Sequence, residues 1–449
     1  MSKKQHIEEN TWHMQTRKEY SKKRQIAGNA AWMIGCKVFQ ALLGVVITMF
    51  TARFLGPSNY GIINYASSLV AFVAPIGKLG LDSILVNELI NQPDREGEII
   101  GTSIVMSLIS SLLCIVGLAG FVALANPGEE ITLIVCILYS IVLFAYAVEL
   151  IQYWFQAHLL SKYPSIAMLV AYFAKSVYQV ILLVNGSDIC WFALSSAFDV
   201  FIIDAIILVQ YKRITKQKLS YSLAAAKRMF AQSKHYIVSS MMVTIFANTD
   251  RIMIKMMLGD SQTGFYSAAV ACASITSFVF SSIMYSVRPI ILEKHKNKEK
   301  SFDNWLTALY SIILYLSLVQ CVFIAAFAPL IIRILYGSNY TAAIEPLRWI
   351  VWYTTFSYLG TVRNIWIIAN EKHNLLWKIN LVGAVSNVLL NLVMIPLYGI
   401  SGAAIASLLT QIITNVVLCF VFTELRPTLR YLKDSLNFIK CIKTLKALV

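Results

Sequence analysis

Charged side chains lie inside long apolar runs of this 449-residue sequence, and they are the residues best placed to do chemistry there. A charge at the centre of a bilayer costs about 2.5–3.5 kcal/mol, so it marks a substrate or ion pathway or pairs with another charge. The basic residues in these runs are Lys37, Lys78, Lys175, Arg251, Lys255, Arg288, Arg333, Arg348, Arg363 and Lys378. The acidic residues are Asp82, Glu149, Asp199, Asp204 and Asp250. Most of them must pair, reach the membrane surface or face a hydrated cavity.

Two lysines are the strongest candidates to bind an anionic substrate. Lys37 shares a helical stripe with Gln40, and Gln179 follows Lys175 by about one helical turn. Both lysines lie too deep in their runs to reach the membrane surface easily, so we predict that they face a cavity. An alternative is that each lysine neutralises a buried acid such as Asp199. Two arginines complete the cationic candidates: Arg288, which could instead extend to the membrane surface, and Arg363.

Amide side chains recur at helical spacing in the last two apolar runs. One run carries Asn387 and Asn391, and the other carries Gln411 and Asn415. Such residues can hydrogen-bond between helices inside a membrane, or they can bind sugar hydroxyls in a hydrated lumen. We include all four among the predicted substrate-binding residues.

Three aspartates are predicted ion-coupling residues: Asp82, Asp199 and Asp250. A buried carboxylate can hold a proton or Na⁺ during transport, or it can balance a nearby lysine. Lys78 and Asp82 are spaced i,i+4 and could form such a structural pair. The sequence contains no metal-ligand cluster and no DxD or HExxH pattern, so we expect no cofactor beyond a coupling ion, H⁺ or Na⁺.

The apolar runs themselves define the class of protein. Hydrophobic residues make up 58% of the chain and charged residues 14%, whereas a soluble domain carries about 25% charged residues. Many runs approach the length of about 20 residues that spans a bilayer. We therefore predict an all-α polytopic membrane protein with about twelve transmembrane helices in two six-helix bundles. The predicted helices cover residues 27–52, 60–85, 99–124, 131–153, 163–184, 189–210, 235–258, 264–292, 305–335, 343–369, 375–397 and 402–421.

The distribution of positive charge orients these helices. With the N-terminus in the cytoplasm, 27 Lys and Arg residues fall on the cytoplasmic side and one, Arg53, falls on the other. This follows the positive-inside rule, so both termini are predicted to be cytoplasmic, and the net charge of +15 does not indicate nucleic-acid binding. The predicted segments are a basic tail (1–26), a first bundle (27–210), a cytoplasmic linker with an interfacial helix (211–234), a second bundle (235–423) and a second basic tail (424–449).

The two halves share a spaced motif. Leu55-Gly56, Gly61 and Ala66 recur as Leu258-Gly259, Gly264 and Ala269, each at an offset of 203 residues. Because six helices, an even number, precede the second half, both halves enter the membrane in the same direction. This predicts a parallel repeat about an axis along the membrane normal, an architecture typical of transporters.

Four turn motifs carry a family resemblance. They are FLGPSNYG at 54–61, TDR at 249–251, LYGSNY at 335–340 and IPLYGISGAA at 395–404. In order and spacing the chain resembles Wzx-type O-antigen flippases, in the polysaccharide transporter branch of the MATE-like superfamily. One feature departs from that family, whose members often carry an arginine after a Gly-Leu pair late in helix two. Here Gly80-Leu81 leads to Asn87-Glu88.

The resemblance implies a flippase and not an enzyme. Its substrate would be an undecaprenyl-pyrophosphate-linked O-antigen or related repeat unit, moved from the cytoplasmic to the periplasmic leaflet of the bacterial inner membrane by alternating access. The implied partners are the lipid bilayer and the polymerase and chain-length regulator of the same lipopolysaccharide pathway.

Two other functions fit the same apolar pattern. A MATE-type multidrug or toxin cation antiporter would prefer an acidic cavity, and ten intramembrane cations against five acids argue against it. A membrane-embedded glycosyltransferase or polymerase usually needs a sizeable catalytic loop, and the longest predicted loop covers only residues 211–234.

Overall fold

The computed structural model describes residues 35, 43–215, 217–299, 301–437 and 441. Within these ranges the chain is helical and forms no strand. The first helix described runs Leu43–Gly77. The α-helices that follow are α2 (Leu85–Asn91), α3 (Glu96–Ala125), α4 (Glu130–Ser140), α5 (Val142–Val148), α6 (Gln152–Ala157), α7 (Lys162–Val184), α8 (Ile189–Ile214), α9 (Leu223–Leu258), α10 (Asp260–Ser274), α11 (Ser277–Lys296), α12 (Phe302–Leu335), α13 (Ile344–Ala369), α14 (Asn374–Ile412), α15 (Leu418–Val421) and α16 (Arg426–Ser435). Short 3₁₀ or π segments are η1 (Leu81–Ser83), η2 (Pro93–Arg95), η3 (Glu149–Ile151), η4 (Ser338–Ala343), η5 (Ile413–Val417) and η6 (Thr423–Leu425).

The number of helices agrees with the predicted twelve when a long helix that turns at a glycine is counted as two membrane segments. Eight helices in the described ranges are long and apolar enough to cross a membrane, and the bent pair α10–α11 adds a ninth. Two of the eight, the first helix and the stretch that contains α14, turn at Gly56 and Gly399, whose φ values are +72° and +60°. Dividing those two at their glycines adds two segments, and counting α13, which lies outside that set, gives the expected twelve. The predicted all-α polytopic fold is confirmed.

The second predicted helix is shorter than expected. It ends at Gly77 instead of residue 85, because Leu79 and Gly80 both adopt positive φ, 53° and 64°. The backbone turns here where α9 crosses it, and a Cβ on Gly80 would lie 2.8 Å from the Ser233 carbonyl oxygen. The chain then resumes in η1 and α2.

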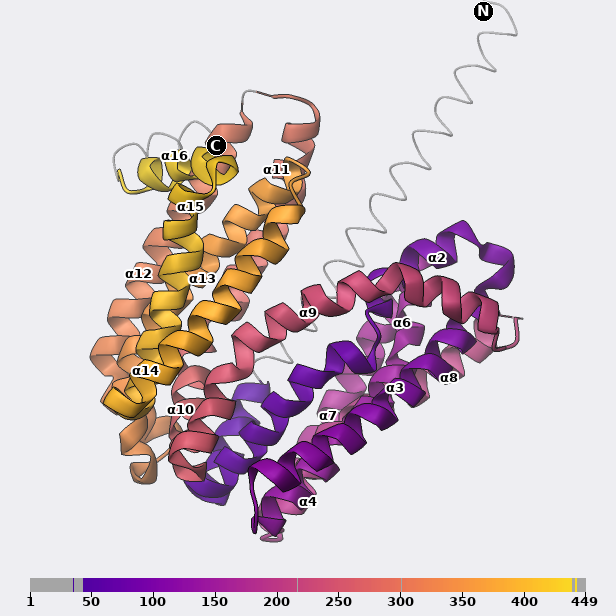
Figure 1. Cartoon of the computed structure of the whole chain (residues 1–449), viewed down its shortest axis with the longest axis horizontal. Coiled ribbons are helices and arrows are strands. Elements are labelled where there is room, and N and C mark those ends of the chain that lie inside the picture. Colours follow the sequence, from indigo (N-terminus) through magenta and orange to yellow (C-terminus); the bar gives the residue numbers. More distant parts are fainter. Residues whose placement is uncertain (1–34, 36–42, 216, 300, 438–440, 442–449) are drawn as a thin grey trace, which may run out of the picture.

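The molecule is V-shaped (Figure 1). One arm contains the first helix and α2–α8, and the other contains α10–α16. The arms converge at the end where α10 and the start of α4 lie, here called the closed end. They diverge toward α2 and α16, here called the splayed end, and the long helix α9 runs from the splayed end of the first arm to the closed end of the second.

Helix α9 is continuous across the predicted boundary between linker and second bundle at residue 235. It begins at Leu223, where the Ser222 side chain accepts a hydrogen bond from the Ala225 amide. The first turns pack on the first arm, where Met229 is fully buried and Arg228 donates to Glu88 at 3.0 Å. The segment expected to be an interfacial helix is thus the start of the helix that joins the arms. The division of the chain into domains stays a prediction.

The repeated glycines meet each other at the closed end. Gly56 and Gly259 occupy equivalent turns with φ of +72° and +88°. A Cβ on Gly61 would overlap the carbonyl oxygen of Asp260, and a Cβ on Gly264 would overlap that of Pro57. Each copy of the motif therefore packs its glycine against the turn of the other copy. This reciprocal contact supports the parallel repeat predicted from the spacing.

Candidate functional site

A polar pocket lies inside the first arm. It has a volume of about 190 Å³ and is lined by Thr48, Thr51, Tyr60, Ile63, Asn64, Ser67, Tyr139, Lys175, Gln179, Phe192, Ser195 and Ser196. Lys175 Nζ donates to Asp199 Oδ1 at 3.0 Å, and Gln179 Nε2 donates to Ser195 Oγ at 3.1 Å. Lys175 thus lines a cavity and also neutralises Asp199. The sequence had suggested these two roles as alternatives, and the structure shows both. An ammonium has three N–H donors, and Asp199 accepts one of them.

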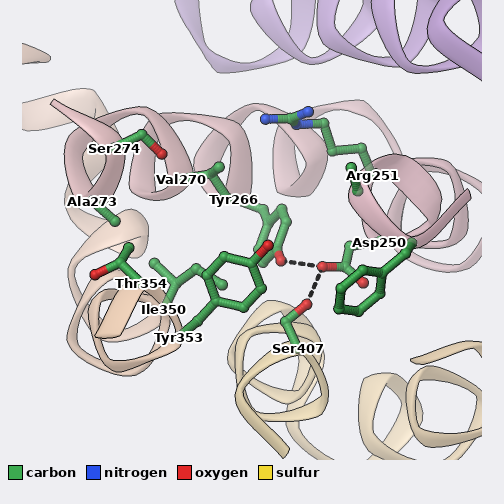
Figure 2. A pocket seen from close by; sticks show the side chains of 12 residues that line it. Asp250, Arg251, Tyr266, Val270, Ala273, Ser274, Ile350, Tyr353, Thr354 and Ser407 are labelled. Atoms are coloured by element: carbon green, nitrogen blue, oxygen red, sulfur yellow. Dashed lines mark hydrogen bonds between the residues drawn. The ribbon is translucent and has the colours of Figure 1, made fainter. Parts of the chain in front are cut away.

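The second arm contains a carboxylate held by neutral donors (Figure 2). Asp250 on α9 accepts hydrogen bonds from Tyr266 at 2.5 Å, Asn387 at 3.0 Å, Asn391 at 2.6 Å and also from Ser407. Each carboxylate oxygen accepts two of the four bonds, which fills its usual hydrogen-bonding capacity. The aspartate is buried, and it borders a cavity of about 50 Å³.

Three elements build this carboxylate site. Tyr266 comes from α10, whereas both asparagines and Ser407 come from α14, on opposite sides of the Gly399 break. Pro396 and the positive φ of Gly399 reverse the chain there, and a Cβ on Gly402 would overlap the Met394 carbonyl. The turn motif at 395–404 therefore brings the two limbs of α14 together around Asp250.

The other predicted amides and Arg363 form a structural cluster. Asn415 Nδ2 donates to Gln411 Oε1 at 2.5 Å, and a Cβ on Gly360 would overlap the Asn415 side chain. Arg363 is buried and donates from Nη1 to the Thr414 carbonyl at 2.6 Å. Thr414 lies in the π-helical segment η5, where the hydrogen-bond register changes. These three residues join α13 to the end of α14, and none of them lines the cavities described here.

A third cavity opens between α11 and α13. It has a volume of about 370 Å³, and its polar lining comprises Ser281, Tyr285, Arg288, Ser357, Tyr358, Thr361 and Asn364. Arg288 is exposed, so its guanidinium is available to a ligand. The combination of a cation, an aromatic ring and several hydroxyls suits a ligand that carries both phosphate and sugar.

Lys78 does not form the pair with Asp82 that their i,i+4 spacing allows. Lys78 Nζ donates to Glu149 Oε2 at 3.1 Å and lies 4.4 Å from the centroid of the Tyr146 ring. The i,i+4 geometry requires an unbroken helix, and the left-handed residues Leu79 and Gly80 interrupt it. Asp82 lies beyond that break in η1 and is partly exposed. The predictions for two further residues, Lys37 and Gln40, lie outside the described residues.

Sequence reasoning did not find an ion cluster that joins the arms at the closed end. Lys255 on α9 donates to Glu129, just before α4, at 2.5 Å, and it also pairs with Asp260. Burial raises the pKa of Glu129, but hydrogen bonds from Lys255 and Thr132 outweigh burial and hold that pKa below its usual range. We call Lys255, Glu129 and Asp260 the interarm clasp. Lys255 and Glu129 are 126 positions apart, so no local pattern could have paired them.

Further contacts close the same end. Tyr340 donates to the Ala52 carbonyl at 2.7 Å, and Arg53 donates to the Ile334 carbonyl at the end of α12. The Tyr60 ring centroid lies 6.3 Å from those of both Tyr336 and Tyr340. Together with the clasp and the glycine contacts, these interactions hold the arms together at this end.

Two splayed helical arms with polar pockets inside an apolar exterior define a polytopic membrane protein. A profile of the family described as "Polysaccharide biosynthesis protein" matches residues 26–295, which is more than half of the chain. The chain belongs to this family.

Individual relatives agree with that placement, and solved structures share the fold. The chain is 22% identical to the "Capsular polysaccharide biosynthesis protein CapF" of Staphylococcus aureus, over 86% of this chain and 97% of that one. It is 23% identical to the "Probable low-salt glycan biosynthesis flippase Agl15" of Haloferax volcanii, over 44% and 42%. Its fold is similar to "Lipid II flippase MurJ, inward closed conformation", with a TM-score of 0.70, 15% identity and 90% of each chain covered. It is also similar to an inward-facing "multidrug resistance MATE family transporter of the MOP superfamily", with a TM-score of 0.64, 14% identity and coverages of 88% and 95%.

Proposed function

We propose that this protein is a flippase for a lipid-linked oligosaccharide, and specifically for an undecaprenyl-pyrophosphate-linked O-antigen or related polysaccharide repeat unit. The observation that carries the proposal is that each arm has a pocket lined by hydroxyls and a cation, Lys175 in one arm and Arg288 in the other. Family membership and the capsular and glycan-flippase relatives support the substrate class.

The pockets suggest how the headgroup is bound. Arginine pairs with phosphate through charge-assisted hydrogen bonds, which are about twice as strong as neutral ones. Arg288 would bind the diphosphate, with Tyr285 and Asn364 beside it, while hydroxyls and Gln179 of the first-arm pocket would bind sugars. The lipid tail would stay in the bilayer as the headgroup crosses. Lys37 and Gln40 remain proposed members of the same path.

The arms would alternate between two arrangements around this path. We propose that the splayed end and both termini face the cytoplasm of the bacterial inner membrane, so that substrate enters from the inner leaflet. Asp250 is the preferred coupling residue, because four neutral donors surround it and a small cation or proton could replace one of them. The polymerase and chain-length regulator of the pathway would receive the product.

Purified protein in liposomes provides the test. A fluorescent polyprenyl-diphosphate oligosaccharide on the inner leaflet should become accessible to an external glycosidase when the protein is present. Arg288→Ala should slow this step by about 10- to 100-fold, because a hydrogen bond to a charged group contributes about 1.5–3 kcal/mol. Arg426→Ala, at an exposed position on α16, is the matched control.

Three results would count against the proposal. They are no movement of the probe, equal rates in both variants, or normal surface polysaccharide with raised drug sensitivity in a deletion strain. The last of these would favour a cation antiporter.

A further inference from the structure

Three buried aspartates inside the arms have different environments. Asp199 pairs with Lys175, and Asp250 accepts four hydrogen bonds. Asp204 on α8 is only 4% exposed, yet neither of its carboxyl oxygens has a hydrogen-bond partner among the described residues. Native proteins rarely leave a buried polar group in this condition, so each such group requires an explanation.

Among the described residues, the charged groups that act on Asp204 are another acid and one lysine. They are Glu149 in η3 and Lys78 after the first helix. Those two groups pair with each other at 3.1 Å, and the Tyr146 ring covers the ammonium. The cluster therefore contains two carboxyl groups but a single ammonium group.

Charge balance determines how many protons this cluster holds. If both carboxyls were ionised, the cluster would carry a net negative charge, and the buried Asp204 carboxylate would have no partner. An uncompensated buried charge destabilises a protein by several kcal/mol, whereas one added proton makes the cluster neutral. The proton forms an O–H bond on a carboxylate oxygen, and no other reactant is needed.

We propose that Asp204, together with Glu149 and Lys78, forms a proton-binding site in the first arm, separate from the Asp250 site, and that its proton exchanges during transport. The proton binding stands independently, whereas its role in transport rests on the proposed flippase function. The site lies near the point where α9 crosses the chain at Gly80, two residues after Lys78. Gly80 has a positive φ, and a Cβ on it would lie 2.8 Å from the carbonyl oxygen of Ser233 in α9. Because α9 joins the arms, a change in their separation would alter the packing at this site.

Infrared spectroscopy of the full-length protein in nanodiscs tests the binding. Wild type should show the carbonyl band of a buried protonated carboxylic acid near neutral pH. Asp204→Asn should abolish that band, because the remaining Glu149–Lys78 pair is already neutral. Asp188→Asn, a matched change at an exposed position, should leave the band in place. Glu149→Gln provides a second variant, which should also lose the band because Asp204 can then pair with Lys78.

Transport under an imposed pH gradient tests whether the Asp204 proton exchanges during transport. The gradient should accelerate probe movement in wild type and in Asp188→Asn, and Asp204→Asn should lose this response. A band that is missing from wild type, or that persists in both Asp204→Asn and Glu149→Gln, would overturn the proton site. An unchanged gradient response in Asp204→Asn would overturn its role in transport. A wild-type protein that has the band but moves no probe would support the proton site and contradict the proposed flippase function.

Discussion

The interarm clasp should influence how often the two arms separate at the closed end of the molecule. A closed molecule is one in which the arms meet there, and an open molecule is one in which they do not. Lys255 is buried, with 1% of its side chain exposed, and it binds Glu129 of the first arm and Asp260 next to its own helix. Glu129→Gln removes the ionic contact between the arms and leaves the Lys255–Asp260 pair intact. The variant therefore perturbs the arrangement of the arms without leaving the buried ammonium unpaired.

The size of the effect follows from that geometry. A hydrogen bond between charged groups contributes about 1.5–3 kcal/mol, and the Glu129 side chain is 42% exposed, which places this bond at the lower limit. About 1.4 kcal/mol corresponds to a tenfold change in an equilibrium constant. Glu129→Gln should thus raise the ratio of open to closed molecules by about tenfold.

Distances between spin labels would report this shift. Labels at Asn185 and Asn339, exposed sites on opposite arms, would be introduced into a variant that lacks the native cysteines. Glu129→Gln should increase the long-distance population, whereas Glu130→Gln, at the exposed neighbouring residue, should match the unsubstituted protein. Identical distance distributions in all three proteins would refute the clasp as a determinant of closure.

The pH dependence of the clasp has a definite sign. Since the pKa of Glu129 is lowered in the folded protein, its stabilising contribution is fully present above the unfolded pKa of about 4.3 and is lost as the pH falls through the lower pKa of the folded protein. The closed population should therefore stay constant through neutral pH and decrease only in strong acid. A decrease between neutral pH and about pH 6, a range in which glutamate normally stays ionised, would contradict this assignment.

Two further substitutions test the fold and the first-arm pocket. Gly61→Ala should destabilise the protein by about 1–3 kcal/mol, because its methyl group would overlap the Asp260 carbonyl. Gly117→Ala, in open space on α3, should be neutral or stabilising, and equal melting temperatures would count against the glycine contact. Lys175→Ala should lower the amount of protein in the membrane, since removing one partner of a buried pair costs about 3–5 kcal/mol. Adding Asp199→Asn should restore that amount, and a failure to do so would indicate that the lysine does not act by neutralising Asp199.

The elements of this fold could be predicted because their signals are local. Apolar runs long enough to cross a bilayer must satisfy their backbone hydrogen bonds internally, so each forms a helix wherever it lies in the fold. The predicted helices 305–335 and 343–369 accordingly end at the same residues as α12 and α13 and begin within three residues of them. The turns at Gly56 and Gly259 could be located because glycine adopts positive φ more readily than other residues.

The partners of the buried charges depended on the tertiary structure. The i,i+4 spacing allowed Lys78 to pair with Asp82. In the structure, however, the helix is interrupted at Gly80, where α9 crosses it, and Lys78 pairs with Glu149. Asp199 and Asp204 lie five positions apart on one helix, yet among the described residues Asp199 forms an ion pair with a lysine and Asp204 forms none. Electrostatic partners are set by distances of a few ångströms between separate helices, so the sequence alone determined which segments enter the membrane, and only their packing decided which charges meet.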